Sequence, residues 1–396
     1  MAGRKTALEG IRVLDLGRYQ AGPRAGLELA RMGAEVIKLE SLEGDESRQG
    51  VPQVRGQSGY WVQYNSGKKC IALDTRNEKG RRIIRDLVKI SDVFIQNFRP
   101  GVIGKMGFSY DVLHQLNPGI IMLNVSAYGQ YGPYKDRVGL DTVGQAISGF
   151  MSITGYPENP PTRAGSSIVD RVTALHGTIG VLAALHERQF SGEGQSIDVC
   201  LADSGYSLTE IAMVKYLEAG EFTEREGNFR AGSYNGAYQT KDGWVALVGS
   251  SQNIFERICE MIGRPEWKTD PRFTDRSTRR ENAEVPRQAL IEWFLTMTMK
   301  EAVAALAQAG IPGTEINNIA QAAAEPHLWE RELMVKVSDP IAGTIHVPGK
   351  FIKLSRSETV VGSPAAIGQH NEEILCGLLN YSRQQLDELR SEGVIR

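Results

Sequence analysis

The residue with the clearest chemical potential is Asp170, which opens an apolar run extending to about residue 189 and stopped by Gly192 and Gly194. The run predicts a long helix, and aspartate is a preferred N-cap residue. A second interpretation is chemical. A carboxylate in a dry site can attack an activated acyl group, and its own carbonyl can then carry the displaced thiol, which a Ser or Cys side chain cannot do. We expect the helix N-terminus to keep this carboxylate ionised at neutral pH.

Other familiar catalytic patterns are absent from the sequence. The turn holding Gly17, Gly22 and Gly26 lacks the G-x-G-x-x-G spacing of dinucleotide-binding proteins, and Pro23 stiffens it. No Gly-Lys pair is followed by Ser or Thr, so a phosphate-binding loop is not expected. No G-x-S-x-G elbow of a serine hydrolase occurs either.

Metal and disulfide chemistry are also not expected. The four cysteines are far apart and form no C-x-x-C pair, which is typical of reduced thiols in a cytoplasmic protein. The six histidines show no metal-ligand spacing, so no metal site is predicted.

The charge balance limits the partners. Lys plus Arg is 45 and Asp plus Glu is 47, which argues against nucleic acid as the main partner but allows a local basic pocket. We expect no secretory signal and no membrane span, because no stretch approaches about 18 uncharged apolar residues. The expected location is therefore the cytoplasm.

The elements that position Asp170 follow an α/β pattern. Short β-branched runs alternate with helical patterns over the first 200 residues, which predicts a parallel sheet of Rossmann-like type. The predicted strands are residues 11–16, 35–40, 70–73, 93–96, 120–125 and 196–201.

Beyond about residue 217 the character changes. A Glu- and Gly-rich segment predicts a linker, and Asp242-Gly243 predicts a hairpin turn followed by helices at 254–262 and 287–309. The expected organisation is a large Rossmann-like domain at 1–217, a linker at 218–230, a small α+β domain at 231–318 and a C-terminal return to the large domain at 319–396.

Several segments together resemble the family III CoA transferases, the group that includes formyl-CoA, carnitine and bile-acid CoA transferases. They occur in the family's order over most of the chain: residues 8–40, 65–81, 91–113, 141–155 and 161–204, with a weaker match at 263–284. The resemblance implies transfer of CoA from an acyl-CoA to a free carboxylic acid, through aspartyl anhydride and aspartyl-CoA thioester intermediates. It also implies an interlocked homodimer. CoA would be a substrate, with no permanently bound cofactor.

The resemblance assigns roles to individual residues. Asp170 falls at the position of the family's catalytic aspartate, and Asp141, Gly249 and Gln252 fall in the vicinity of the active site, with 249–253 as the candidate lid. The implied CoA-binding residues are Gln20, Ala21, Leu73, Asp74, Thr75, Arg76, Asn97, Phe98, Arg99 and Lys105.

Two other functions stay open. The α-methylacyl-CoA racemases share this resemblance, but they use a histidine where this chain has Leu140, so a proton carrier is missing. A non-catalytic regulator that binds acyl-CoA is the other alternative. Ser41 replaces an arginine of the formyl-CoA enzymes, which argues against an oxalate-specific enzyme.

Overall fold

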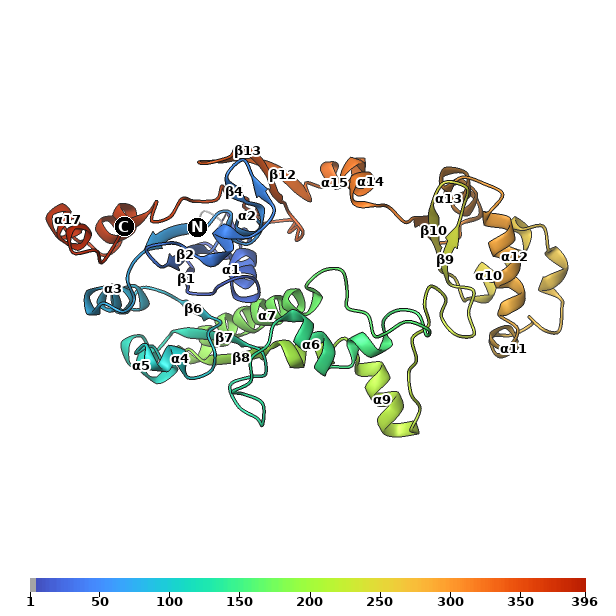
Figure 1. The fold of residues 1–396 in the computed structure, drawn as a ribbon, viewed down its shortest axis with the longest axis horizontal. Coiled ribbons are helices and arrows are strands. Elements are labelled where there is room, and N and C mark those ends of the chain that lie inside the picture. The colour runs from blue at the N-terminus through green and yellow to red at the C-terminus, as the bar shows by residue number, and fades with distance from the viewer. Residues whose placement is uncertain (1–4) are drawn as a thin grey trace. The chain divides into compact units, whose positions relative to one another are not determined.

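The structure, a computed structural model, describes residues 5–396. Contacts divide the chain into two units (Figure 1). The first unit comprises the chain up to Phe150 together with Ala164–Ile211 and Pro326–Arg396, and the second comprises Met151–Arg163 and Ala212–Glu325. The predicted linker at 218–230 therefore falls inside the second unit, and the first unit is assembled from three separate stretches of chain.

The first unit is built on a six-stranded parallel sheet with the order β5-β2-β1-β6-β7-β8. Its strands are β1 (Arg12–Asp15), β2 (Glu35–Glu40), β5 (Lys69–Ala72), β6 (Val93–Gln96), β7 (Ile121–Ser126) and β8 (Ser196–Cys200). Strands β6 and β7 are buried at every position, as expected for strands covered on both faces. The chain turns from one side of the sheet to the other between β1 and β6, and the carboxyl ends of strands at such a point commonly bind ligands.

Alternate residues of the strands belong to two different hydrophobic cores, one on each face of the sheet. Val13 belongs to the core that includes residues of α1 (Ala21–Arg31) and α7 (Ile168–Ser191). Leu14 belongs to the opposite core, with α3 (Glu78–Val88), α5 (Tyr110–Leu116) and the C-terminal helices α16 (Asn371–Gly377) and α17 (Arg383–Ser391). The sheet is thus covered by helices on both sides (Figure 1), and the predicted mixed α/β fold with a parallel sheet is confirmed.

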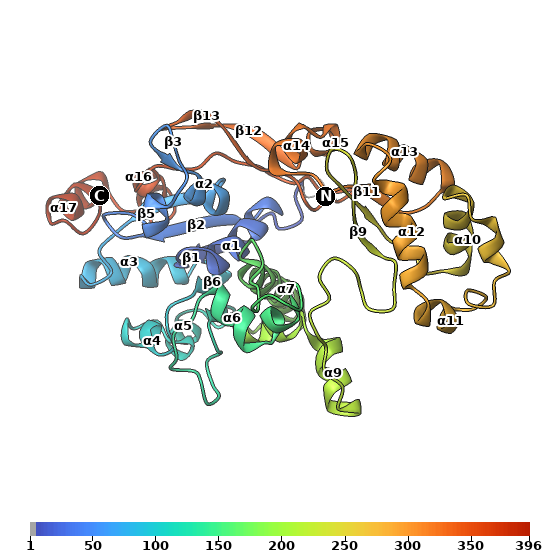
Figure 2. The same cartoon turned by 45° about the vertical axis from the view of Figure 1, so that its right-hand side comes forward.

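The remaining elements of the first unit are short. The helical segments are η1 (Glu46–Gln49), α2 (Gly59–Asn65), α4 (Val102–Lys105), α6 (Asp141–Ile147), α8 (Leu201–Tyr206) and α15 (Pro326–Glu330). Two hairpins complete the first unit. One pairs β3 (Gln53–Val54) with β4 (Gln57–Ser58), and the other pairs β12 (Met334–Asp339) with β13 (Gly343–Pro348). Trp61 and Val62 of α2 share a small core with Ile345 and Val347 of β13, and Figure 2 shows these two elements close together.

The second unit has its own aromatic core around a three-stranded antiparallel sheet. Its elements are β9 (Gly236–Gln239), β10 (Trp244–Leu247), β11 (Gly313–Glu315), α10 (Gln252–Met261), η3 (Pro265–Lys268), α11 (Arg276–Glu281), α12 (Glu284–Phe294), α13 (Met299–Ala309) and α14 (Ile319–Ala324). The prediction of one continuous helix at 287–309 is wrong, because α12 ends at Phe294 and α13 begins as a separate helix at Met299. A capping box between Thr298 and Glu301 fixes that second start. Two further segments, η2 (Phe150–Ile153) and α9 (Glu210–Ala219), cross the boundaries between the units.

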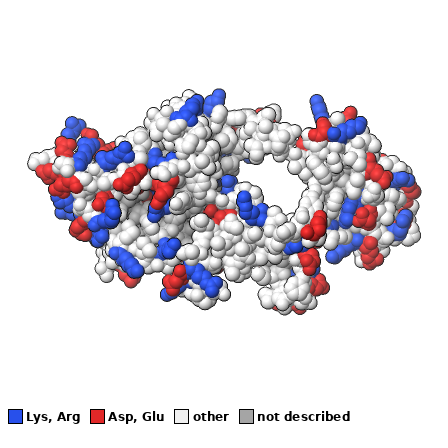
Figure 3. Space-filling model, in the orientation of Figure 1, with Lys and Arg blue, Asp and Glu red and all other residues white. Residues whose placement is uncertain are grey.

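Among residues 5–396, α7 alone is long and apolar enough to cross a membrane by length and composition. Its Ala174 and Val181 are buried against the sheet core. Part of this helix is therefore enclosed by the protein itself. Lys and Arg are interspersed with Asp and Glu on the face seen in Figure 3, in line with the near-neutral net charge.

Candidate active site

Asp170 is the third residue of α7 and does not cap it. The N-cap is Ser167, and its side chain makes no capping hydrogen bond. The interpretation of Asp170 as a plain N-cap is therefore wrong. No hydrogen bond or ion pair among the described residues uses an oxygen of the Asp170 side chain, although the residue is largely buried.

The carboxylate that caps α7 belongs to Asp141, at the start of α6. Its Oδ1 atom accepts the backbone amides of Val169 at 2.9 Å and of Asp170 at 3.1 Å. Its Oδ2 atom accepts the side-chain amide of Gln145 at 2.5 Å, and Oε1 of Gln145 accepts the backbone amide of Ala164 at 2.9 Å. Asp141 and Gln145 are buried, so these charge-assisted bonds fix the start of α7 against α6.

The same arrangement changes the acidity of Asp170. Burial, followed by the charge of Asp141, raises the pKa of Asp170 from 3.8 to about 7. The helix N-terminus was expected to keep Asp170 ionised at neutral pH, but a pKa of about 7 leaves part of this carboxyl protonated there. Asp141 accepts hydrogen bonds from the first backbone amides of the helix, and its negative charge disfavours a second negative charge on Asp170.

Gln20 reaches the start of α7 from the turn after β1. Its Nε2 atom lies 3.5 Å from the carbonyl oxygen of Ser167, at the outer limit of a hydrogen bond. Its Oε1 atom accepts the hydroxyl of Tyr60, on α2, at 3.2 Å. Burial raises the pKa of the Tyr60 phenol, and the nearby Tyr64 and Asp170 raise it further. Gln20, Tyr60 and Asp170 therefore belong to one neighbourhood. No sequence motif pointed to Tyr60.

The turn that carries Gln20 is held in a strained conformation. Tyr19 has a φ of 59°, which is uncommon for a residue other than glycine. Asn97, at the end of β6, accepts the Arg18 amide at 2.7 Å and donates to the Arg18 carbonyl at 2.7 Å. Asn97, predicted as a CoA contact, thus binds the turn directly. Ala21, the first residue of α1, is buried behind it.

Two buried lysines hold the backbone on either side of this turn. Lys38 donates to the carbonyl oxygen of Gly17 and forms an ion pair with Asp45. Lys68 donates to the carbonyl oxygen of Pro23 at 2.7 Å and pairs with Asp15 at 2.7 Å. Because both side chains are fully buried, these ion pairs and hydrogen bonds compensate their desolvation and fix the path of residues 17–23.

The candidates that follow β5 differ in exposure. Leu73 lies in the core, so its side chain is not available to a ligand. Thr75 is partly buried, while Arg76 is exposed and its Nε lies 3.2 Å from Oδ1 of Asp74. The C-terminal residues cover this point, because the Asp74 amide donates to the carbonyl of Val394 at 2.8 Å.

The candidates that follow β6 lie at the same carboxyl edge of the sheet. Phe98 is partly buried, with the Arg18 guanidinium 6.0 Å from its ring centre. Arg99 and Lys105 are exposed and form no ion pair within residues 5–396. This edge therefore offers two cations and an aromatic ring beyond the turn that holds Gln20.

Gly249 and Gln252 belong to the second unit. The Gly249 amide donates to Asn235 at 2.7 Å, and Gln252 opens α10, where it donates to Glu256 at 2.8 Å and accepts from Arg279. The first unit thus brings Asp170, Asp141, Gln20 and Tyr60 together without these two residues.

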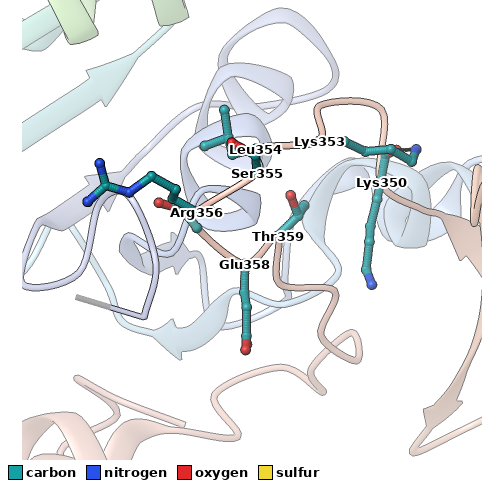
Figure 4. A pocket seen from close by; sticks show the side chains of 8 residues that line it. Lys350, Lys353, Leu354, Ser355, Arg356, Glu358 and Thr359 are labelled. Carbon is teal, nitrogen blue, oxygen red and sulfur yellow. Dashed lines mark hydrogen bonds between the residues drawn. The ribbon is translucent and has the colours of Figure 1, made fainter. Parts of the chain in front are cut away.

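Of two cavities in the first unit, the larger has no link to this site. It measures about 450 Å³ and is lined by the loop from Lys350 to Thr359. Figure 4 shows the side chains of Arg356 and Lys350 pointing away from each other, so they do not converge on one anion. The second cavity measures about 290 Å³ and includes Arg171, the neighbour of Asp170. The residues that the structure describes contain no group of three or more His, Cys, Asp or Glu that could hold a metal ion.

Comparison with known proteins places this site in a family. Residues 8–371 match the model described as CoA-transferase family III. The chain is 36% identical over 393 residues to the succinyl-CoA–D-citramalate CoA-transferase of Chloroflexus aurantiacus, covering 98% of both chains. It is 32% identical over 397 residues to the succinyl-CoA:glutarate CoA-transferase of Homo sapiens, covering 98% of this chain and 90% of that one.

A solved structure agrees with these relatives. The crystal structure of a CAIB/BAIF family protein from Brucella suis matches with a TM-score of 0.83 and 31% sequence identity, covering 95% of this chain and 100% of that one. The resemblance seen in the sequence is confirmed over nearly the whole chain. This protein belongs to CoA-transferase family III and is an acyl-CoA:carboxylate CoA-transferase.

Proposed function

We propose that Asp170 is the covalent nucleophile of CoA transfer. The observation that carries this proposal is a buried carboxylate whose oxygens are engaged by no described residue, because Asp141 takes the helix amides in its place. With a pKa of about 7, a large fraction of Asp170 is ionised at neutral pH, and poor solvation makes that carboxylate more reactive than one in water.

The first half-reaction moves CoA onto the enzyme. An oxygen of Asp170 attacks the thioester carbonyl, the carbon–sulfur bond breaks, and an acyl-aspartyl anhydride and CoA thiolate form. The thiolate then attacks the aspartyl carbonyl carbon. The bond to the bridging oxygen breaks, which releases the donor acid as a carboxylate and leaves an aspartyl-CoA thioester.

The second half-reaction reverses these steps with another acid. The acceptor carboxylate attacks the aspartyl thioester, expels CoA thiolate and forms a new mixed anhydride with Asp170. The thiolate attacks the acceptor carbonyl, so the new acyl-CoA leaves and the Asp170 carboxylate is regenerated. No net proton is consumed, and no metal or redox cofactor takes part.

The residues around Asp170 suit this chemistry. The Gln20 amide is close enough to the start of α7 to donate to the oxyanion of a tetrahedral intermediate, and Tyr60 holds that amide in place. Hydrolysis of either intermediate would waste the thioester, so water must be excluded. We assign that task to the segment 249–253 of the second unit, acting as a lid.

CoA itself would lie along the carboxyl edge of the sheet. Arg76, Arg99 and Lys105 are exposed cations suited to the phosphates of CoA, and Phe98 offers a ring for its adenine. Thr75 and the backbone of Leu73 and Asp74 complete this edge, while Asn97 and Ala21 shape the turn beside it.

The acid substrates are proposed from the relatives. The two enzymes compared above are named for citramalate and glutarate, with succinyl-CoA as donor, and all of these acids carry two carboxyl groups. We infer that this enzyme also exchanges CoA between short dicarboxylic acids.

An interlocked homodimer in the cytoplasm is part of the same proposal. Leu175, Ile179 and Phe190 form an exposed apolar stripe along α7, and Ile211 and Leu217 are exposed on α9. Apolar surface of this extent commonly marks an interface, and a second copy of the chain would cover it.

The test is intact mass after acid quenching of the protein mixed with a panel of acyl-CoAs. An acyl or CoA adduct on the wild type that is absent from Asp170→Ala supports the proposal. Transfer activity without any dependence on Asp170 would overturn it.

The racemase alternative gains no support, since Leu140 is exposed and carries no titratable group. Incorporation of deuterium at the α-carbon of a branched acyl-CoA in heavy water would revive it. Binding of acyl-CoA without any turnover would instead favour the regulator.

A further inference from the structure

The lining of the second cavity includes Arg171, the residue that follows the proposed nucleophile in the sequence. Its walls come from α1, α2, the first turn of α7 and the hairpin of β12 and β13, all within the first unit. Arg171 contributes to its lining, as do Gln63 of α2 and His346 of β13. Its volume of about 290 Å³ is near the lower end for ligand pockets, which suits a short acid better than a whole CoA molecule.

Two tyrosines of α2 connect this cavity to Asp170. The hydroxyl of Tyr64 lies beside the Arg171 guanidinium and accepts from Nε2 of Gln63 at 3.3 Å. The rings of Tyr60 and Tyr64 meet edge to face at 5.1 Å, and the charge of Asp170 acts on both phenols. Tyr60 also donates to Gln20, so contacts through the two tyrosines link the lining residues Gln63 and Arg171 to the surroundings of Asp170.

The cations of the cavity are not equivalent. Arg24 is tied to Glu28 at 2.6 Å, and both side chains are largely buried, so the charge of Arg24 is already neutralised. Arg171 is exposed and forms no ion pair within the described chain. Its contact with the Tyr64 hydroxyl leaves further guanidinium N–H groups to donate two hydrogen bonds to a carboxylate. Met334, Pro348 and Phe351 supply an apolar wall for a short carbon chain.

We propose that this cavity binds the second carboxylate of a dicarboxylic acid, with Arg171 as its principal contact and Gln63 as an additional donor. This inference rests on the proposed function, because it requires the first carboxyl carbon to react at Asp170. The free acceptor acid and the acyl group of the donor thioester occupy the same position in turn, so both would present a distal carboxylate to Arg171.

The test compares matched acids on Arg171→Met and Arg171→Lys. Acceptors are glutarate and its monocarboxylate counterpart valerate, and donors are succinyl-CoA and butyryl-CoA. We expect Arg171→Met to lower kcat/KM for glutarate about 10- to 100-fold, while valerate changes by less than about 2-fold. The kcat/KM of Arg171→Lys for glutarate should fall between those of the wild type and Arg171→Met, because lysine keeps the charge but cannot form the paired hydrogen bonds of a guanidinium.

The donor pair separates the two sources of the distal carboxylate. Both donors are measured with one acceptor. If Arg171→Met lowers kcat/KM for succinyl-CoA but not for butyryl-CoA, the site also binds the distal carboxylate of the donor's acyl group. Arg356→Met, an exposed arginine in the other cavity, is the control and should leave all four substrates unchanged.

Two results would overturn the inference. Equal losses for mono- and dicarboxylic substrates would show that Arg171 only supports Asp170, and unchanged kinetics would show that the cavity is not used. In either case an adduct on Asp170 by acid-quenched mass would leave the proposed function intact. Absence of that adduct from the wild type would remove the function itself.

Discussion

The carboxylate of Asp141 accepts the backbone amide of Asp170 at 3.1 Å, so one acid holds the main chain of the other while opposing its ionisation. Orientation and acidity of the proposed nucleophile are thereby set by the same neighbour.

The first prediction concerns the pH dependence of transfer. Because the pKa of Asp170 is raised to about 7 and the ionised form is the nucleophile, kcat/KM should increase with pH around 7 and level off above it. Asp141→Asn removes the neighbouring charge, so the midpoint should move to lower pH. Rate measurements between pH 5 and 9 on both proteins test this, and an unchanged midpoint in the variant would refute the coupling.

The second prediction concerns stability. The carboxyl of Asp170 ionises near 3.8 when unfolded and near 7 when folded, so the wild type loses stability as pH rises through this window. The full difference corresponds to about 4 kcal/mol, and partial exposure reduces it. We expect Asp170→Asn to increase the free energy of unfolding at pH 8 by about 2 kcal/mol, with no gain at pH 3.

Urea denaturation at several pH values measures this difference. Asp111→Asn is the matched control, because Asp111 is an exposed acid in the first turn of α5. A gain of equal size at all pH values would mean that ionisation of Asp170 is not its cause.

The third prediction concerns the buried lysine beneath the Gln20 turn. Lys68→Met leaves the Asp15 carboxylate buried without its partner and should lower the free energy of unfolding by about 3–5 kcal/mol. Lys69→Met, which removes a neighbouring and partly exposed lysine, should cost about 1 kcal/mol or less. Chemical denaturation compares the two, and equal losses would contradict the assigned role of the buried pair.

The fourth prediction concerns Tyr60. Tyr60→Phe removes the hydroxyl that holds Gln20 and should lower kcat about 3- to 10-fold, as expected for loss of one hydrogen bond, with little change in KM. Tyr381→Phe is the control, since Tyr381 packs against the opposite core and its hydroxyl donates to Asp86 at 3.4 Å. A change confined to KM would place Tyr60 in substrate binding instead.

The sequence predicted the parallel sheet and most of α7 because both depend on local patterns. Each strand is a short β-branched run, and the apolar run after Asp170 has helical spacing. Residue contacts over long separations were not predictable in this way. Asp141 caps a helix that begins 27 residues later, and Lys68 meets Asp15 across 53 positions.

Local signals also misled in particular places. Aspartate at a helix start is typical of an N-cap, but the N-cap of α7 is Ser167. The carboxylate that accepts the first helix amides belongs to Asp141, which is distant in the sequence. The apolar spacing of residues 287–309 predicted one helix, although the Thr298–Glu301 capping box marked a second start. A capping box inside an apolar run was the signal that could have been used.

The pairing of the chain end with strand β5 has a consequence for biosynthesis. Ile395 forms a bridge with Leu73, and the Arg396 amide donates to the carbonyl of Ala72, so the last residues cover the edge strand of the sheet. On the ribosome, all six strands emerge well before these residues, and the edge beside Asp74 and Arg76 stays unpaired until residues 394–396 have been synthesised. This edge of the sheet is therefore completed after the rest of the sheet has emerged.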